Sequence, residues 1–285
     1  MGLHIPKLGR RVVSAISFSA LLLFISACSA EDKASVKRLA EPTPITKEGW
    51  DMHYMWLYSW LALMVVGVIV WGLIFIVPFV YRRKKGDTHT PVQVRYHLPI
   101  EVFYTLVPVM MVIVMFFFTV RVQNDVVELK KDPDYVINVV GFQWSWAFNY
   151  EKSPTNDNLN VYEGGTTATK PELWIVKDKT VEFQLTSPDV IHSFWVPAFI
   201  FKLDVVPGRV NKFQVTPDRL GTFDGRCAEL CGVYHSRMLF NLKVVTQEEF
   251  DAHMKELEQR GNIGKVAGGT IPSEVAGLES KGEAK

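Results

Sequence analysis

Three long apolar runs stand out from an otherwise mixed pattern of hydrophobic and polar residues. The first covers residues 12–25, and the other two cover residues 52–81 and 102–120 and contain no Asp, Glu, Lys or Arg. About 20 apolar residues at 1.5 Å per residue cross a hydrocarbon layer of ~30 Å. The second and third runs therefore predict two transmembrane helices, with spans of about 53–81 and 99–120.

The charges around these two spans indicate their orientation. The loop 82–98 carries several basic residues, whereas the segments outside the spans are of mixed sign. Because basic loops stay on the cytoplasmic side, this loop is expected in the cytoplasm and both chain ends outside. The region 51–121 is therefore interpreted as a helical hairpin in a cell membrane.

The first apolar run is typical of an export signal. Basic residues precede it, it is too short to span a membrane, and small residues follow it. Ile25-Ser26-Ala27-Cys28 resembles a bacterial lipobox, which predicts a signal peptide over 1–27 and lipid attachment at Cys28. The alternative is a plain secretory signal with an incidental cysteine. In either case residues 28–50 are expected to be an exported segment.

The pattern changes after the second span to short alternating stretches bounded by Gly, Pro, Asn and Asp. Strands at this spacing predict an antiparallel sandwich of Greek-key type, assigned to residues 122–248. Residues 247–261 place apolar side chains at helical spacing, so the region 249–285 is expected to hold a short amphipathic helix and a loose tail. The clearest predicted strands are 135–140, 172–176, 180–186, 209–216 and 238–245.

Composition excludes two broad classes of protein. The chain of 285 residues has 31 Lys and Arg against 30 Asp and Glu, a formal net charge of +1. This near-balance argues against binding nucleic acid through bulk positive charge. With 48% hydrophobic residues, the chain is also not disordered throughout.

The candidate chemistry lies in Cys-Ala-Glu-Leu-Cys-Gly-Val-Tyr-His-Ser-Arg-Met, residues 227–238. Thiolates and thioethers are soft ligands and imidazole is borderline, a set that favours copper over magnesium, calcium or manganese. A second imidazole, His192, lies upstream in a predicted turn. A mononuclear blue-copper site uses one Cys, whereas Cys227 and Cys231 could both bridge two copper ions. Each copper would then need one His and one weak ligand, and Met238 and a backbone carbonyl are available.

Two simpler interpretations of these residues remain open. Cysteine pairs in exported proteins are usually disulfides. Two Cys and two His can also bind zinc, although that leaves Met238 and Glu229 without a role. Met238 taken alone is more typical of a core strand residue than of a ligand.

The pattern C-x-E-x-C-G-x-x-H-x-x-M, preceded by D-V-x-H-S-x-x-V-P and D-x-x-P-G-R, resembles subunit II of bacterial haem–copper cytochrome c oxidases. The resemblance covers nearly all of the chain after the signal. It implies a cupredoxin-like sandwich that holds the dinuclear copper centre CuA. Its implied ligands are the thiolates of Cys227 and Cys231, the imidazoles of His192 and His235, the thioether of Met238 and the carbonyl of Glu229. It also implies that the Glu229 carboxylate helps to bind magnesium at the boundary with the catalytic subunit.

An aromatic segment precedes the predicted copper loops. In a continuous strand, Phe142, Trp144, Trp146 and Phe148 would share one face, which alone indicates a buried aromatic surface. By resemblance to the family, Trp144 is the residue through which electrons enter. Ser145 stands where the family usually has an aromatic residue, which weakens any detailed route.

Glu101 is the last candidate residue. It follows Pro99 at the start of the second span, where an acid is favoured by the helix dipole. The segment matches the family pattern E-x-x-[WY]-T-x-x-P, in which the glutamate stands at the mouth of a proton-uptake channel of the catalytic subunit. Both interpretations remain open.

Together these features predict the subunit that passes electrons from a soluble or membrane-bound cytochrome c to the haem–copper subunit I, with other oxidase subunits as neighbours. That complex reduces oxygen to water and translocates protons. Two alternatives belong to other classes. One is a copper-free scaffold subunit of a quinol oxidase, which is expected to lack the thiolates and imidazoles. The other is an exported copper-binding lipoprotein, which would not explain the second span or Glu101.

Overall fold

The computed structural model describes residues 30–154 and 159–268. The chain divides into two compact units, Met1–Thr43 and Pro44–Lys285. The described part of the first unit holds α2 (Ala30–Lys37), and Glu31 of this helix forms a salt bridge of 2.9 Å with Arg38. The predicted signal peptide and Cys28 lie outside the described residues.

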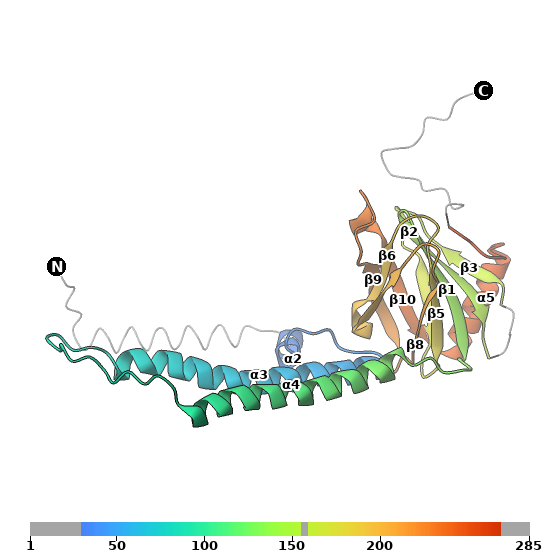
Figure 1. Ribbon diagram of the computed structural model, residues 1–285. Coiled ribbons are helices and arrows are strands. Elements are labelled where there is room, and N and C mark those ends of the chain that lie inside the picture. Colours follow the sequence, from blue (N-terminus) through green and yellow to red (C-terminus); the bar gives the residue numbers. More distant parts are fainter. Residues whose placement is uncertain (1–29, 155–158, 269–285) are drawn as a thin grey trace. The chain divides into compact units, whose positions relative to one another are not determined.

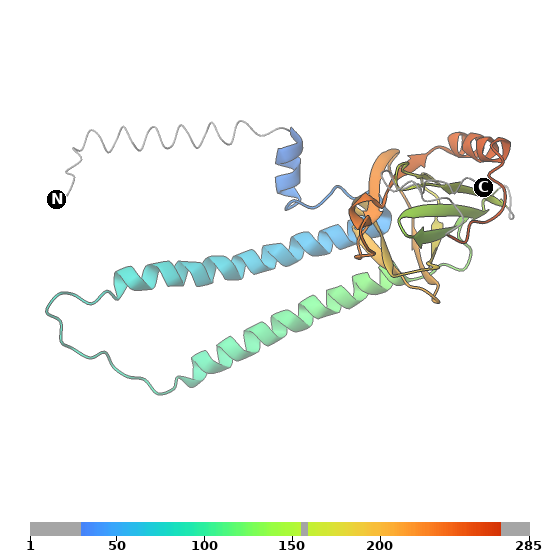
Figure 2. The same ribbon diagram turned by 90° about the horizontal axis from the view of Figure 1, so that it is seen from above.

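The second unit begins with the predicted helical hairpin, α3 (Lys47–Val80) and α4 (Leu98–Val127), which Figure 2 shows with its connecting loop. Their most apolar windows have mean hydropathies of 2.8 and 2.3, and none of either window is buried within the chain. Helices with exposed apolar side chains at this length are suited to a membrane. The structure thus confirms two helices that are long and apolar enough to span a bilayer.

Both helices extend beyond the predicted spans. At 1.5 Å per residue the 34 residues of α3 measure about 51 Å, well over the ~30 Å of a hydrocarbon layer. The first turn of α3 contacts the sandwich instead. There Thr216 donates its backbone N–H to the Glu48 carboxylate at 3.0 Å, and the Trp50 indole donates to Asp218 at 2.8 Å.

The sandwich consists of two five-stranded sheets (Figure 1). One sheet has the order β3-β2-β1-β5-β8 and the other β4-β10-β9-β6-β7. The predicted fold class, a two-helix hairpin followed by an all-β sandwich, is therefore confirmed. The strands are β1 (Tyr135–Phe142), β2 (Ser145–Lys152), β3 (Val161–Gly164), β4 (Glu172–Val176), β5 (Val181–Thr186), β6 (His192–Val196), β7 (Phe201–Val205), β8 (Asn211–Val215), β9 (Gly221–Cys227) and β10 (Leu239–Val245).

The strand pairing is mixed, which differs from the antiparallel expectation. β1 pairs with β5 in parallel, and so does β4 with β10. The chain leaves the first sheet after β3, adds β4 to the second sheet and returns as β5, and this crossover allows β1 and β5 to run in the same direction. All five strands predicted from the sequence are present with ends shifted by a few residues.

Large aromatic side chains fill the space between the sheets. Phe194 stacks on Phe240 with ring centroids 5.0 Å apart, and Trp146 meets Phe240 edge-on at 5.6 Å. Such pairs stabilise a core beyond the area that they bury. Phe194 lies in β6 and Phe240 in β10, and β9 lies between these two strands in the sheet, so the core fixes the strands from which the candidate ligands project. The largest fully buried side chains include Trp146, Tyr135, Tyr150, Phe148, Phe183, Phe194, Phe199, Phe240 and Phe250.

The predicted aromatic strand face is wrong in one respect. A turn at Gln143 and Trp144 ends β1 and starts β2, so the alternation breaks there. Trp146 and Phe148 lie in the main core, but Phe142 packs in a separate small cluster with Val140, Ala147 and Val266. The turn leaves the Trp144 side chain half-buried beside the candidate ligand loop.

The chain closes with α5 (Gln247–Gln259), the predicted amphipathic helix. Thr246 and Glu249 form a capping box at its start, and Phe250, Met254 and Leu257 are buried. Residues 261–268 do not form the expected loose tail, because they run back along the first sheet. Val266 is 7% exposed and exchanges two hydrogen bonds of 2.9 Å with the Asn149 side chain.

Candidate metal centre

The predicted ligands come from two places at one end of the sandwich. His192 begins β6, whereas Cys227 ends β9 and opens a loop that runs to Met238, directly before β10. Antiparallel pairing of β6 with β9 aligns Phe194 with Cys227 and brings the two places together. The Cys227 N–H donates to the Met238 carbonyl at 3.0 Å, which closes the loop at its base.

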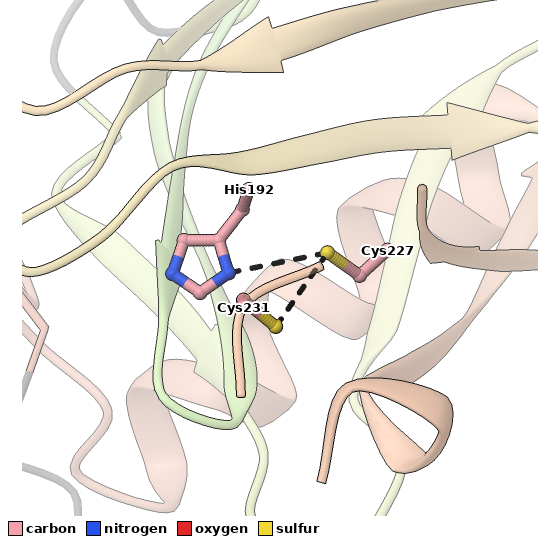
Figure 3. Close-up of side chains that lie close together, drawn as sticks. All are labelled: His192, Cys227 and Cys231. Carbon is pink, nitrogen blue, oxygen red and sulfur yellow. Dashed lines mark hydrogen bonds between the residues drawn. The ribbon is translucent and has the colours of Figure 1, made fainter. Parts of the chain in front are cut away.

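The side chains converge on a compact buried cluster, part of which Figure 3 shows. The Cys227 and Cys231 sulfurs are 3.9 Å apart, which is too far for a disulfide bond of about 2.05 Å. Cys227 Sγ lies 3.9 Å from His192 Nδ1 and Cys231 Sγ lies 3.6 Å from His235 Nδ1. Two weak donors complete the set, Met238 Sδ at 3.8 Å from Cys231 Sγ and the Glu229 carbonyl at 3.2 Å from Cys227 Sγ.

The two thiols are electrostatically unequal. The hydrogen bond between the two sulfurs lowers the pKa of Cys227, against burial, and His192 adds to the effect. The neighbouring Cys227 sulfur together with burial raises the pKa of Cys231. Two adjacent thiolates repel each other, so both can be deprotonated only with positive charge between them. A metal cation supplies that charge.

An acid behind His192 orients its ring. Asp189 Oδ1 lies 2.8 Å from His192 Nε2, so Nε2 carries the proton and Nδ1 is free to face the sulfurs. Burial lowers the pKa of His192, but Cys227 and Asp189 outweigh it and the net shift is upward. Burial raises the pKa of Asp189, yet its hydrogen bonds with His192, Gln143 and Val190 lower it overall. Asp189 thus remains a charged partner of the imidazole.

Trp144 contacts the ligand loop directly. Its indole N–H donates to the Cys231 carbonyl at 3.2 Å, and the Gln143 amide donates to the same oxygen at 2.7 Å. Gly232 has φ +124°, and a Cβ there would lie 3.0 Å from the Trp144 indole nitrogen. Glycine is therefore required here both for its backbone conformation and for the close approach of Trp144.

The donor set fits copper better than the other metals considered. The two thiols, two imidazole nitrogens and one thioether are soft or borderline donors, as Cu ions prefer, and the one carbonyl oxygen is a weak additional donor. Zinc would need only four of these donors, whereas Met238 Sδ lies within the cluster and its side chain is 0% exposed. Among the described residues, His192, Cys227 and Cys231 form the one group of three acidic, His or Cys side chains placed to hold a metal ion.

Two predicted residues lie outside this cluster. Glu229 is exposed, although its backbone carbonyl faces Cys227. Glu101 lies in the first turn of α4, is half-buried, and accepts the His97 N–H at 2.9 Å. This contact agrees with the first of the two interpretations of Glu101, an acid that is favoured at the start of a helix. It does not test the proton-uptake role.

The sequence indicated the ligands but not the residues that hold them. Asp189 is the first residue of the motif D-V-x-H-S-x-x-V-P and Gln143 lies between Phe142 and Trp144, yet the sequence predicts no role for either side chain. The signal for Asp189 was its position three residues before a candidate ligand histidine. Gly232, next to Cys231, could be recognised only as a possible turn residue.

Comparison with known proteins identifies the family. Residues 135–245 match the family model described as cytochrome c oxidase subunit II, periplasmic domain. The chain is 44% identical to a probable cytochrome c oxidase subunit 2 of Streptomyces avermitilis over 91% of both chains. It is 33% identical to cytochrome c oxidase subunit 2 of Mycobacterium tuberculosis over 87% of this chain and 82% of that protein.

Among solved structures, the periplasmic domain of subunit II of cytochrome oxidase of Bradyrhizobium japonicum is 30% identical. It covers 46% of this chain and 99% of that chain with a TM-score of 0.41. The relatives from Streptomyces and Mycobacterium match over the hairpin as well as the sandwich. The chain therefore belongs to the cytochrome c oxidase subunit 2 family.

Proposed function

We propose that this chain accepts electrons at a dinuclear copper centre, CuA, and passes them to the haem–copper subunit of an oxidase that reduces oxygen and translocates protons. The observation that carries the proposal is the buried cluster of two free thiols, two imidazoles, a thioether and a carbonyl. A copper-free scaffold would not need these donors. An exported copper-binding lipoprotein would not need α3 and α4.

Each proposed ligand is assigned by the sulfur that it lies beside. Cys227 and Cys231 would both hold the copper pair, since each sulfur has one imidazole and one weak donor beside it. His192 and the Glu229 carbonyl lie on the Cys227 side, and His235 and Met238 lie on the Cys231 side. A thiolate-bridged copper pair shares one unpaired electron over both metals, so electron transfer requires little change in bond lengths.

The protein keeps this geometry fixed. Strands β6, β9 and β10 hold the ligand segments from a core of stacked aromatic rings. Asp189 fixes the His192 ring, and the Cys227–Met238 backbone hydrogen bond closes the loop. A rigid set of ligands favours rapid electron transfer because the protein does not rearrange with each electron.

The test is metal content with electron spin resonance on the purified full chain in detergent. Two coppers per chain that share one unpaired electron support the proposal. One copper with an ordinary four-line pattern instead favours a copper carrier. Each of Cys227→Ser and Cys231→Ser is expected to abolish the shared signal, because one bridge cannot hold both metals in the same geometry. Full cytochrome c oxidation by either variant would count against the assignment.

Trp144 is proposed as the residue through which electrons arrive from cytochrome c, soluble or membrane-bound. Its indole is half-buried and donates a hydrogen bond to the backbone of the ligand Cys231, which gives a short route of bonds to the sulfur. Trp144→Phe should slow copper reduction by cytochrome c and leave the copper spectrum unchanged. Trp174→Phe, in β4, is the matched control. An unchanged reduction rate in Trp144→Phe would exclude this route.

The Glu229 carboxylate is proposed as a magnesium ligand at the contact with subunit I. Its support is the exposed position of Glu229 beside the copper ligands together with the preference of magnesium for carboxylate oxygen. Manganese substituted into the assembled oxidase gives a resonance signal that Glu229→Gln should weaken or remove. The exposed Asp224→Asn is the control. An unaltered manganese signal in Glu229→Gln would refute the role.

Glu101 is proposed to stand at the mouth of a proton-uptake channel of subunit I, with the loop 82–98 in the cytoplasm. Acids in membrane helices tend to be functional. Glu101→Ala should slow oxygen reduction in the assembled enzyme while cytochrome c still reduces copper at the normal rate. Loss of copper from this variant would contradict the role.

Lipid attachment at Cys28 is proposed as a second anchor on the outer side of the membrane. The support is the lipobox-like sequence Ile25-Ser26-Ala27-Cys28. Mass spectrometry of the purified chain should find residue 28 at the N-terminus with diacylglycerol attached, and Cys28→Ser should lack that mass. An unmodified Cys28 would rule this out.

A further inference from the structure

A second buried group of ionisable side chains lies between α5 and the sandwich and shares no residue with the copper site. His253 of α5 has a side chain that is 6% exposed. Its Nε2 lies 3.7 Å from Oε2 of Glu163 in β3, and its Nδ1 lies 3.5 Å from Oε2 of Glu256, one turn further along α5. The ring therefore lies between two carboxyl groups.

With a neutral His253 and two ionised carboxylates, this arrangement has one proton too few to pair both nitrogens of the ring with a carboxyl group. A neutral imidazole has a single N–H, so it can donate to one carboxylate while its other nitrogen faces the second. Both contacts become favourable only when one further proton is bound. Within the described residues, Glu163 Oε2 and His253 Nε2 are buried and have no hydrogen-bond partner. Buried polar atoms are normally paired, so these two atoms mark where that proton belongs.

The surroundings decide which group carries the proton. Trp174 of β4 stacks on the His253 ring at 4.1 Å, and Lys243 of β10 lies over the same indole at 4.6 Å. Burial raises the pKa of Glu163 to about 7, with Arg260 opposing and nearby acids adding to the shift. Burial lowers the pKa of His253, with Glu256 opposing. Both shifts favour a neutral ring beside a neutral carboxylic acid.

The remaining polar groups around the cluster already have partners. Glu172 of β4 forms a salt bridge of 2.8 Å with Lys243, and Arg260 pairs with Glu256. The Tyr150 hydroxyl of β2 accepts the Trp174 N–H at 2.9 Å. The unpaired Glu163 Oε2 and the unpaired His253 Nε2, 3.7 Å apart, are therefore the pair that a shared proton would serve.

We propose that Glu163 and His253 form a proton-binding site that fastens α5 to the sandwich, and that loss of this proton above neutral pH loosens the helix. The protonated Glu163 carboxyl can donate to His253 Nε2 once the 3.7 Å between the two atoms shortens to hydrogen-bond range, and His253 Nδ1–H faces Glu256 Oε2 at 3.5 Å. When the proton leaves, a carboxylate is left buried against the bare nitrogen.

The sign of the pH effect follows from Glu163. Its pKa in the folded chain lies above the ordinary value of 4.5, so its contribution to stability is present on the acidic side. That contribution is lost as pH rises through about 7. The lowered pKa of His253 acts only on the acidic side, where the ring itself would take up a second proton.

The position of α5 connects this site to the copper end of the sandwich. Residues 261–268 follow α5, and Val266 is bound to Asn149. Gly268 lies against Pro188, since a Cβ at Gly268 would be 2.7 Å from that ring. Pro188 precedes Asp189, which orients His192. Fastening α5 therefore also secures a segment that ends beside the loop of a copper ligand.

Hydrogen exchange of the full chain in detergent micelles, followed by mass spectrometry at pH 6.0 and 8.5 and corrected for intrinsic exchange, tests the proposal. Exchange of the α5 amides should rise on the order of tenfold between pH 6.0 and 8.5, since with a pKa of about 7 the deprotonated fraction of Glu163 rises from about one tenth to nearly all. Glu163→Gln, which can always donate to His253, should remove this pH dependence. The exposed Glu258→Gln of α5 should behave like the unaltered chain.

Two results would overturn the proposal. One is equal corrected exchange of α5 at both pH values, and the other is a Glu163→Gln variant with the original pH dependence. Infrared spectroscopy of the unaltered chain gives a measurement that does not require a variant to fold. A protonated carboxyl band should be present at pH 6.0 and disappear by pH 8.5, and absence of that band at pH 6.0 would also overturn the proposal.

Discussion

Asp189→Asn isolates the group that orients a copper ligand without changing its size. Asp189 Oδ1 lies 2.8 Å from His192 Nε2 and accepts the Val190 N–H at 2.6 Å, while Oδ2 accepts the Gln143 N–H at 2.7 Å. Asparagine has one oxygen in place of two. Whichever way the amide turns, at least one of these donors then faces an NH₂ group.

The cost can be worked out from these contacts. In the cheaper orientation the oxygen stays on His192 and Val190, and the Gln143 N–H is left unpaired. This hydrogen bond is exposed, so water can replace the lost partner and the loss costs about 0.5–1.5 kcal/mol. The bond to His192 also loses its charge, and charge-assisted hydrogen bonds are roughly twice as strong as neutral ones. Loss of such a partner behind a ligand imidazole typically weakens metal binding about 10–100-fold, or about 1.4–2.8 kcal/mol.

The assay is competition between the purified full chain and a copper chelator, with the shared-electron resonance signal reporting the bound copper. We expect Asp189→Asn to release copper at about 10–100-fold lower chelator concentration. The exposed Asp224→Asn of β9 is the matched control and should bind like the unaltered chain. Copper affinity equal to that of the unaltered chain in Asp189→Asn would show that the His192 ring does not depend on this acid.

Three further outcomes can be checked. Gly232→Ala should destabilise the loop by about 1–3 kcal/mol, because φ is +124° and the new Cβ meets the Trp144 indole. An unchanged near-ultraviolet circular dichroism spectrum together with an unchanged free energy of unfolding would contradict this. Phe250→Ala should lower the free energy of unfolding by about 3–5 kcal/mol in denaturant titration, since the Phe250 side chain of α5 is fully buried. A loss below about 1 kcal/mol would show that α5 is not firmly packed on the sandwich. Burial raises the pKa of Glu182, but hydrogen bonds from Gln214, Gln184 and Lys212 lower it overall. The stabilising contribution of this carboxylate therefore holds above about pH 4.5 and is lost on further acidification. Glu182→Gln should flatten the dependence of the free energy of unfolding on pH in that acidic range.

Local pattern determined much of this protein. The two apolar runs became α3 and α4 because spans of that length and hydrophobicity are helical whatever surrounds them. The strands 172–176 and 238–245 could be read from alternation, and the ligands from residue types at fixed spacing. Cys227, Cys231, His235 and Met238 lie within one loop, so their chemistry is visible without a fold.

Only the tertiary structure decided how these pieces meet. Parallel pairing of β1 with β5 depends on a crossover between sheets, which no local pattern encodes. The turn at Trp144 breaks a strand that alternation alone would continue. Residues 261–268 are low in hydrophobicity, yet Asn149 holds them on the sheet.

The same holds for the groups that tune the chemistry. Asp189 acts through a hydrogen bond across a bend, and Glu163 meets His253 across ninety residues of sequence. Hydrophobic periodicity predicts which face of an element is buried, because the preference of a side chain for the interior depends on its own polarity and not on a particular partner. Hydrogen bonds and shared protons depend on distances between atoms from different elements, and those distances exist only once the chain has folded.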